Sequence, residues 1–317
     1  MPMTFGIYPG GLLGDERGIV HPVSPDDPDR VDRALDTLQG DAGTLSVRAY
    51  RSFATTVTPN PPTPADPYAH VRRGRTLDLV LQFREPTGSL DGWTGFVREA
   101  VRDGGPGLAS VQICEEPNLD LPPVDGSVPN VLEALVQGVV AAKDEARSLG
   151  RRVAVGFNAV PSFDPADTFW ADLGALAGPR FRESLDYVGL DFFPDVFRPV
   201  APDGLAEAVT AVLTSYRRTS LPKAGIPDTV AVRVCENGWP TGPGRTVERQ
   251  AAVLETVIRT TAALADELNI DGYSLFALRD ADSGAEGIFP HFGLLYDDYT
   301  PKPAFAAYRR LIAELGR

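Results

Sequence analysis

Residues 232–240 read Val-Arg-Val-Cys-Glu-Asn-Gly-Trp-Pro, and residues 111–118 read Val-Gln-Ile-Cys-Glu-Glu-Pro-Asn. Each stretch is a short apolar segment typical of a buried strand, and each ends in acidic side chains followed by turn residues. A carboxylate at the tip of an apolar strand loses hydration, which costs free energy unless the group is paired or used. We therefore interpret Glu116 and Glu236 as functional carboxylates that converge on one site.

Around these two segments, the chain alternates strand-like and helical segments about eight times, as in the α/β barrels. The predicted strands are Thr4–Tyr8, Leu45–Tyr50, Asp78–Phe83, Ser110–Cys114, Arg152–Phe157, Tyr187–Phe192, Val230–Cys235 and Gly272–Phe276. They are rich in Val, Ile and Leu, as expected for parallel strands buried on both faces. The pattern predicts an α/β fold, a single (β/α)8 TIM barrel over residues 1–317. An open doubly wound sheet is the alternative, but the first strand lacks a G-x-G-x-x-G phosphate loop.

Helices are predicted between the strands from apolar periodicity and from capping residues. One follows Ser24-Pro25-Asp26-Asp27 and ends at Gly40. Others span residues 130–149, 246–268 and 303–315, and residues 66–75 are the weakest candidate for a short helix.

The composition bounds the class of partner. The 317 residues have a formal net charge of −13, which argues against nucleic acid and anionic membranes as partners. No segment has the length of a membrane span, and the first residues lead directly into an apolar strand without a signal peptide. We therefore expect a cytoplasmic protein, or a secreted one if the sequence is trimmed. Cys114 and Cys235 are expected to be buried free thiols, and we expect no metal and no organic cofactor.

The two carboxylate segments resemble those of the clan A retaining glycoside hydrolases, which are (β/α)8 barrels. Glu115-Glu116-Pro117 is similar to the Asn-Glu-Pro of their fourth strand, and Glu236-Asn237-Gly238-Trp239-Pro240 is similar to the seventh-strand motif of the glucan endo-1,3-β-glucosidases. Arg48 in Val-Arg-Ala-Tyr is similar to the second-strand arginine of the clan. The resemblance implies a β-linked carbohydrate substrate, with Glu116 as acid/base and Glu236 as nucleophile.

The chain also departs from the clan pattern. Glu115 stands where the clan has the asparagine that contacts the sugar 2-hydroxyl. Phe193 replaces a tyrosine that often contacts the nucleophile, and Phe276 or Ala277 replaces the tryptophan that floors the sugar site. These departures leave the identity of the sugar open.

In a retaining mechanism one carboxyl must be protonated while the other is ionised. Arg48 is expected to keep Glu236 ionised, while burial and the charge of Glu236 raise the pKa of Glu116. A third carboxyl at Glu115 either needs neutralisation by Arg51 or Arg233 or points away from the pocket. The candidate substrate-binding residues are Arg48, Glu115, Asn158, Asp191, Phe193, Trp239 and Phe276.

Two other functions are considered. The departures suggest a carbohydrate-binding barrel that has lost catalysis. A barrel lyase or aldolase would need a lysine at a strand end, and none of the chain's lysines is predicted there.

Overall fold

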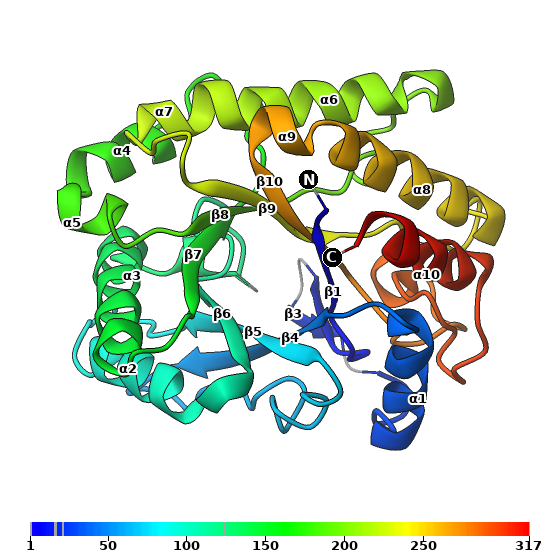
Figure 1. The fold of residues 1–317 in the computed structure, drawn as a ribbon, viewed down its shortest axis with the longest axis horizontal. Helices are drawn as coiled ribbons and strands as arrows, with labels where there is room; N and C mark the ends of the chain where they lie inside the picture. Colours follow the sequence, from blue (N-terminus) through cyan, green and yellow to red (C-terminus); the bar gives the residue numbers. More distant parts are fainter. Residues whose placement is uncertain (1, 16–17, 21, 123, 317) are drawn as a thin grey trace.

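The computed structural model describes residues 2–15, 18–20, 22–122 and 124–316, and its centre is a closed parallel barrel (Figure 1). The strands are β1 (Thr4–Ile7), β4 (Leu45–Phe53), β5 (Arg75–Phe83), β6 (Leu108–Ile113), β7 (Ala154–Ala159), β8 (Tyr187–Asp191), β9 (Ala231–Asn237) and β10 (Ile270–Leu275). Their order is β1-β10-β9-β8-β7-β6-β5-β4, and β1 pairs with β4 to close the barrel. The predicted (β/α)8 barrel is thereby confirmed.

Helices surround the barrel, as Figure 1 shows. They are α1 (Pro28–Gln39), α2 (Trp93–Asp103), α3 (Val131–Ser148), α4 (Phe169–Leu176), α5 (Pro179–Arg182), α6 (Leu205–Ser215), α7 (Leu221–Lys223), α8 (Val247–Ala263), α9 (Ala265–Leu268) and α10 (Pro303–Leu315). Short helical turns of other types cover Gly105–Gly107, Asp125–Ser127, Pro202–Gly204, Tyr216–Ser220 and Phe289–His291. Within the described part of the chain, no helix combines the length and the apolar character needed to cross a bilayer.

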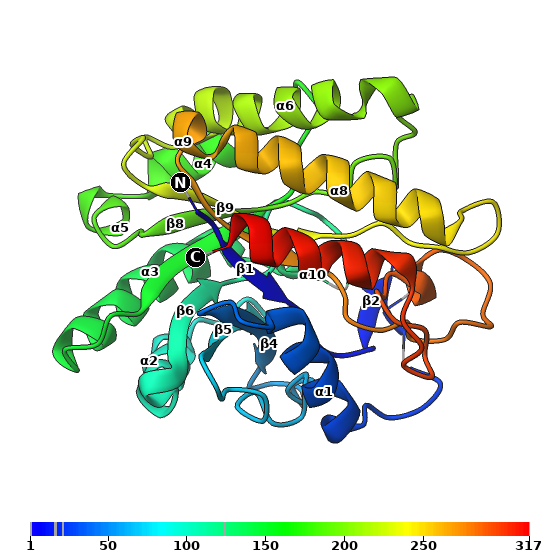
Figure 2. The same cartoon turned by 45° about the vertical axis from the view of Figure 1, so that its right-hand side comes forward.

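A small antiparallel hairpin, β2 (Leu13–Asp15) and β3 (Gly18–Val20), follows β1 and stands outside the barrel sheet. Figure 2 shows β2 beside the orange loops that follow β10. Because it follows the carboxyl end of a barrel strand, this hairpin belongs to the same end of the barrel as the loops that carry active sites.

Side-chain caps begin two of the predicted helices. Asp27, the last residue of the predicted capping segment, caps α1 by accepting hydrogen bonds from the backbone amides of Asp29 and Arg30, and Gly40 ends the helix. Thr246 caps α8, but the predicted 246–268 helix divides at Leu264 into α8 and α9.

The short helix predicted for residues 66–75 is wrong, because this segment forms turns and β5 already begins at Arg75. Arg73 and Gly74 adopt left-handed conformations, with φ of 54° and 84°. A right-handed helix cannot continue through such residues.

The strand boundaries differ slightly from those predicted, and one difference bears on the site. β9 continues through Glu236 to Asn237, so that Glu236 projects from the strand itself, next to a shift in register with β8. β6 ends at Ile113, so that Glu115 and Glu116 lie in the turn after the strand. Cys114 and Cys235 are buried free thiols, as predicted.

Candidate active site

Glu236 lies among hydrogen-bond donors at the carboxyl end of β9. Its Oε1 accepts a hydrogen bond from the Tyr50 hydroxyl, and Arg48 Nε lies 3.3 Å from the same oxygen. Arg48 Nε also donates to the Tyr50 oxygen at 2.8 Å. A hydroxyl donor and a guanidinium therefore meet at one oxygen of Glu236.

Arg48 is fixed inside the barrel by acceptors on the neighbouring strands. Its Nη1 donates to Asp78 at 2.6 Å and its Nη2 to Gln112 at 2.8 Å, while the side chain is only 1% exposed. Asp78 also accepts from Ser110 at 2.6 Å. Burial alone would lower the pKa of Arg48, but the surrounding acidic and phenolic groups raise it well above its ordinary value. Arg48 therefore carries a permanent positive charge below the pocket.

The turn after β6 carries the other two glutamates in an unusual backbone conformation. Cys114 and Glu116 have positive φ angles of 63° and 44°. Non-glycine residues in this region are uncommon and are held there by their surroundings, often at functional sites.

Two buried side chains hold this turn. Asp125 Oδ2 accepts from the backbone N–H of Glu115 at 2.7 Å and from that of Phe83 at 2.9 Å. The other oxygen of Asp125 lies 3.1 Å from Arg84 Nε. Asn158 Oδ1 accepts from the backbone N–H of Glu116 at 2.8 Å. The carboxyl groups of Glu115 and Glu116 therefore depend on Asp125 and Asn158 for their place.

Three carboxyl groups from three segments meet at the carboxyl end of the barrel. Oxygens of Glu115, Asp191 and Glu236 all lie within 4.8 Å of one another, and all three residues are buried. Glu115 therefore points into the pocket. Its Oε2 accepts from Gln112 at 3.2 Å and lies 3.9 Å from Arg48 Nη2.

The proximity of these acids raises the pKa of the groups around Glu236. Burial raises the pKa of Glu115, Glu116 and Asp191 well above the ordinary range, and the charge of Glu236 raises each further. Raised pKa values of this kind, on carboxyls grouped around a further glutamate, are typical of sites that use acid/base chemistry.

Asn158 joins two parts of the site. Its Nδ2 donates to Asp191 Oδ2, while its Oδ1 holds the turn at Glu116. Asn158 and Asp191 are both completely buried. Asn158 therefore orients the acids and does not face open solvent. The second oxygen of Asp191, Oδ1, has no hydrogen-bond partner within the described ranges.

Aromatic rings form one wall of the pocket. Phe276, at the end of β10, stacks on Tyr8 with ring centroids 5.2 Å apart and planes 7° apart. Tyr8 meets the edge of Tyr50 at 5.3 Å, which links this wall to Glu236. A Cβ added at Gly238 would lie 2.0 Å from the backbone oxygen of Phe276, so only glycine allows β9 and β10 to approach this closely.

Trp239 and Phe193 lie beside the pocket in other roles than the resemblance suggests. Trp239 is 3% exposed; Arg245 covers its ring at 4.6 Å, and its Nε1 donates to the Asp195 carbonyl at 3.2 Å. Phe193 packs against Phe292 at 5.6 Å. The hydroxyl contact to Glu236 that Phe193 cannot make comes instead from Tyr50.

The arginines expected to neutralise Glu115 lie elsewhere. Arg233 pairs with Asp271 at 2.7 Å, and Arg51 stands over the ring of Phe96 at 5.2 Å. Arg48 is the arginine beside Glu115, with its Nη2 3.9 Å from Oε2. It lies on the same face of β4 as Tyr50, which is the face that points into the barrel.

The same carboxylates are the described residues best placed to hold a metal ion, because each of Glu115, Asp191 and Glu236 offers one oxygen. The guanidinium of Arg48 already supplies positive charge to two of them, at 3.9 Å and 3.3 Å.

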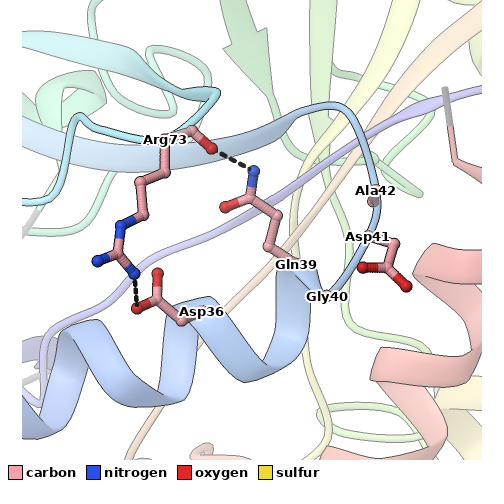
Figure 3. A pocket seen from close by; sticks show the side chains of 6 residues that line it. All are labelled: Asp36, Gln39, Gly40, Asp41, Ala42 and Arg73. Atoms are coloured by element: carbon pink, nitrogen blue, oxygen red, sulfur yellow. Dashed lines mark hydrogen bonds and ion pairs between the residues drawn. The ribbon is translucent and has the colours of Figure 1, made fainter.

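A surface pocket of about 290 Å³ lies away from these acids, where α1 ends and β4 and β5 begin (Figure 3). Arg73 Nη1 donates to Asp36 at 2.8 Å, and Gln39 donates to the Arg73 carbonyl at 2.8 Å. The polar groups here satisfy one another at the amino-terminal end of the strands, which supports stability rather than catalysis.

No family model and no curated protein matches the sequence. Solved structures do match. The chain is similar to a β-glucosidase, β-glucosidase 1317, with 18% identity, a TM-score of 0.59, and coverage of 91% of this chain and 88% of that chain. A glycoside hydrolase family 17 β-1,3-glucanosyltransferase from Rhizomucor miehei matches with 17% identity and a TM-score of 0.60, over 95% and 96% of the two chains.

A family 39 glycoside hydrolase from the gut symbiont Bacteroides cellulosilyticus WH2 matches with 15% identity and a TM-score of 0.61, over all of this chain and 64% of that chain. At these identities the similarity establishes a shared barrel fold. The neighbours are carbohydrate-active enzymes, and the assignment of chemistry to this chain depends on its own residues.

Proposed function

We propose that this protein is a retaining glycoside hydrolase that cleaves a β-linked glycoside or short oligosaccharide without a cofactor. The observation that carries the proposal is the environment of Glu236: Tyr50 and Arg48 stabilise its charge, while burial raises the pKa of Glu116 beside it. The barrel fold shared with known glycoside hydrolases supports it.

In this mechanism Glu236 attacks the anomeric carbon and forms a covalent glycosyl-enzyme, while Glu116 gives its proton to the departing oxygen. Esterification removes the charge of Glu236, so the pKa of Glu116 falls and the residue can accept a proton from the attacking water. The sugar is then released with the configuration of the substrate.

Glu116 is assigned as the acid because it is the more accessible of the two adjacent glutamates. It is partly exposed at the mouth, whereas Glu115 is buried and bonded by Gln112. A leaving group departs towards solvent. Of the two adjacent glutamates, Glu116 is the one on the solvent side, where it can protonate the departing oxygen. We assign Glu115, Asp191 and Phe276 to the sugar site, with Arg48 and Asn158 as their supports and Trp239 and Phe193 in the surrounding wall.

The test is a panel of 4-nitrophenyl β-glycosides and β-1,3-linked glucan oligosaccharides, the latter because of the motif at residues 236–240. The wild type should hydrolyse at least one member with retention, observed by NMR of the first-formed anomer. Glu236→Gln should lower kcat by more than about 10⁴-fold, beyond what a proton-transfer residue alone contributes. Glu99→Gln, an exposed glutamate on α2, is the matched control.

Azide separates the two roles. Added to Glu236→Ala it should give a glycosyl azide of inverted configuration, and added to Glu116→Ala one of retained configuration. Inverted sugar from the wild type would contradict the retaining mechanism. Sugar-dependent thermal stabilisation without turnover on any substrate would instead identify a carbohydrate-binding barrel.

A further inference from the structure

Two phenylalanines are exposed on the loops at the carboxyl end of the barrel. Phe163 follows β7 and is 57% exposed, and Phe197 follows β8 and is 58% exposed. The guanidinium of Arg198 lies over the Phe163 ring at 4.5 Å, which joins the two loops. An exposed phenylalanine ring does not gain the free energy of apolar burial. Two such rings near a candidate active site are therefore typical of a binding surface.

One of the two exposed rings, Phe197, is continuous with the aromatic rings beside Glu236. Phe197 contacts Phe193, with ring centroids 6.0 Å apart, and Phe193 contacts Phe292 at 5.6 Å. Phe292 contacts Phe276 at 6.2 Å, and Phe276 stacks on Tyr8. A path of aromatic rings therefore leads from the surface to the residues beside Glu236.

The loop that presents Phe197 is fixed by polar anchors. Asp195 has a φ of 62°, and its side chain accepts from Val200 N at 3.0 Å and from Arg249 at 3.1 Å. Trp239 Nε1 donates to the Asp195 carbonyl at 3.2 Å. The exposure of Phe197 is therefore part of the folded loop, and Trp239 contributes by holding it.

Phe163 lies on the side of the pocket that carries the acid. Asn118, two residues after Glu116, donates to the Val160 carbonyl at 2.9 Å and accepts from Val160 N at 2.9 Å. This reciprocal pair ties the Glu116 turn to the loop that carries Phe163. A general acid must lie beside the oxygen of the leaving group, so the leaving group occupies this side.

We propose that Phe163 and Phe197 form an aglycone subsite for a flat apolar leaving group, which rests on the glycosidase function proposed above. The outer rings on this path, Phe197, Phe193 and Phe292, are all phenylalanines and have no hydrogen-bonding group. A second sugar would leave hydroxyls without partners there, which costs free energy, whereas an aromatic aglycone has an apolar face to match.

The experiment compares the phenyl and 2-naphthyl β-glycosides of the sugar that the panel selects, or the β-glucosides if it selects none. These leaving groups have similar acidity but differ in apolar area. The wild type should prefer the naphthyl glycoside by about tenfold in kcat/KM, the size of effect that an extra apolar group produces in a pocket. The Phe163→Ala, Phe197→Ala double variant should reduce this ratio to near one. Leu176→Ala, which removes an exposed side chain at the end of α4, should leave it unchanged.

Calorimetric titration with Glu236→Gln, with and without the two alanine substitutions, gives the same ratio from Kd without turnover. A wild type that cleaves no glycoside would contradict the hydrolase, while the calorimetric ratio would still decide the subsite. An unchanged ratio in the double variant, or no binding of either glycoside, would overturn the subsite. If the two alanine substitutions weaken the binding of a β-linked disaccharide as much as that of the naphthyl glycoside, the site is a sugar subsite. That result would also overturn the proposal.

Discussion

The carboxyl ends of β6 and β9 present the same residue type in two opposite environments. Glu236 projects from β9 towards the Tyr50 hydroxyl and lies 3.3 Å from Arg48. Glu116 lies in a left-handed turn that is fixed through its backbone N–H by Asn158. At Glu236 side-chain donors reach the carboxylate itself, whereas at Glu116 a side-chain acceptor holds the backbone N–H.

The difference shows how one fold separates two roles for glutamate. The Glu236 carboxylate accepts a hydrogen bond from the Tyr50 hydroxyl. Burial and the neighbouring charge of Glu236 raise the pKa of Glu116, and the hydrogen bond from Glu116 to Asn158 involves only its backbone.

After the loss of Glu236 itself, the largest expected effect comes from removing the proton of the proposed acid, Glu116. Glu116→Gln should lower kcat/KM for a substrate with a poor leaving group by about 10²–10⁴-fold, the usual contribution of general acid catalysis. A dinitrophenyl glycoside, which needs no protonation, should be affected far less. Measuring both substrates over a range of leaving-group acidity tests the assignment.

The control for this experiment is Glu115→Gln, which should affect good and poor leaving groups alike. In the wild type, activity should fall as pH rises through the raised pKa of Glu116, and Glu116→Gln should lack this alkaline limb. If Glu115→Gln shows the leaving-group dependence instead, the roles of the two adjacent glutamates are exchanged.

A second effect, of about 3 kcal/mol on the free energy of unfolding, is expected from the protonation of Asp125, which holds the turn at Glu115. Burial raises its pKa to about 6 from an ordinary value of 3.8, although Arg84 and two backbone amides oppose the shift. Each pKa unit corresponds to about 1.4 kcal/mol. The folded state binds this proton more tightly than the unfolded state, so the contribution is most favourable below the unfolded pKa and is lost as pH rises through about 6.

Urea unfolding of the wild type and of Asp125→Asn between pH 4 and pH 7 measures this contribution, because other acids titrate in both proteins. The free energy of unfolding of the wild type, relative to the variant, should decline by about 2.4 kcal/mol over that range. A difference that stays constant with pH would mean that the Asp125 carboxyl is not perturbed by burial.

The smallest effect is expected at the donor to Glu236. Tyr50→Phe removes a hydrogen bond to a charged group, which is worth about 1.5–3 kcal/mol, and should lower kcat/KM by about 10–100-fold. The matched control is Tyr187→Phe, because the buried Tyr187 hydroxyl has no hydrogen-bond partner within the described part of the protein. Equal activity of the two variants would mean that Tyr50 does not support the charge of Glu236.

The sequence was sufficient for the barrel because its strands are apolar on both faces and alternate with helices. It also located Glu236, Glu116 and Arg48, which lie at or near strand ends. Tyr50 was within reach of the same reasoning, since a residue two positions after Arg48 on a strand shares its face. The resemblance instead places the hydroxyl that contacts the nucleophile at position 193, where this chain has phenylalanine.

Other parts of the site leave no local signal. Asp125 lies ten positions beyond Glu115, at the start of a short helical turn, and only the folded loop brings its carboxylate to the Glu115 amide. Trp239 is another case, because nothing in its own segment indicates that Arg245 covers the ring. Contacts that depend on how loops return to the barrel are set by tertiary packing, which periodicity does not report.

Asn158 has a consequence for spectroscopy. Because its Oδ1 is committed to the Glu116 amide and its Nδ2 to Asp191, the orientation of this side chain is unambiguous. A ¹⁵N label on that amide would sense the proton of Asp191 directly, without any substitution. The site therefore contains its own NMR indicator, through which the ionisation of a buried acid could be followed while a ligand binds.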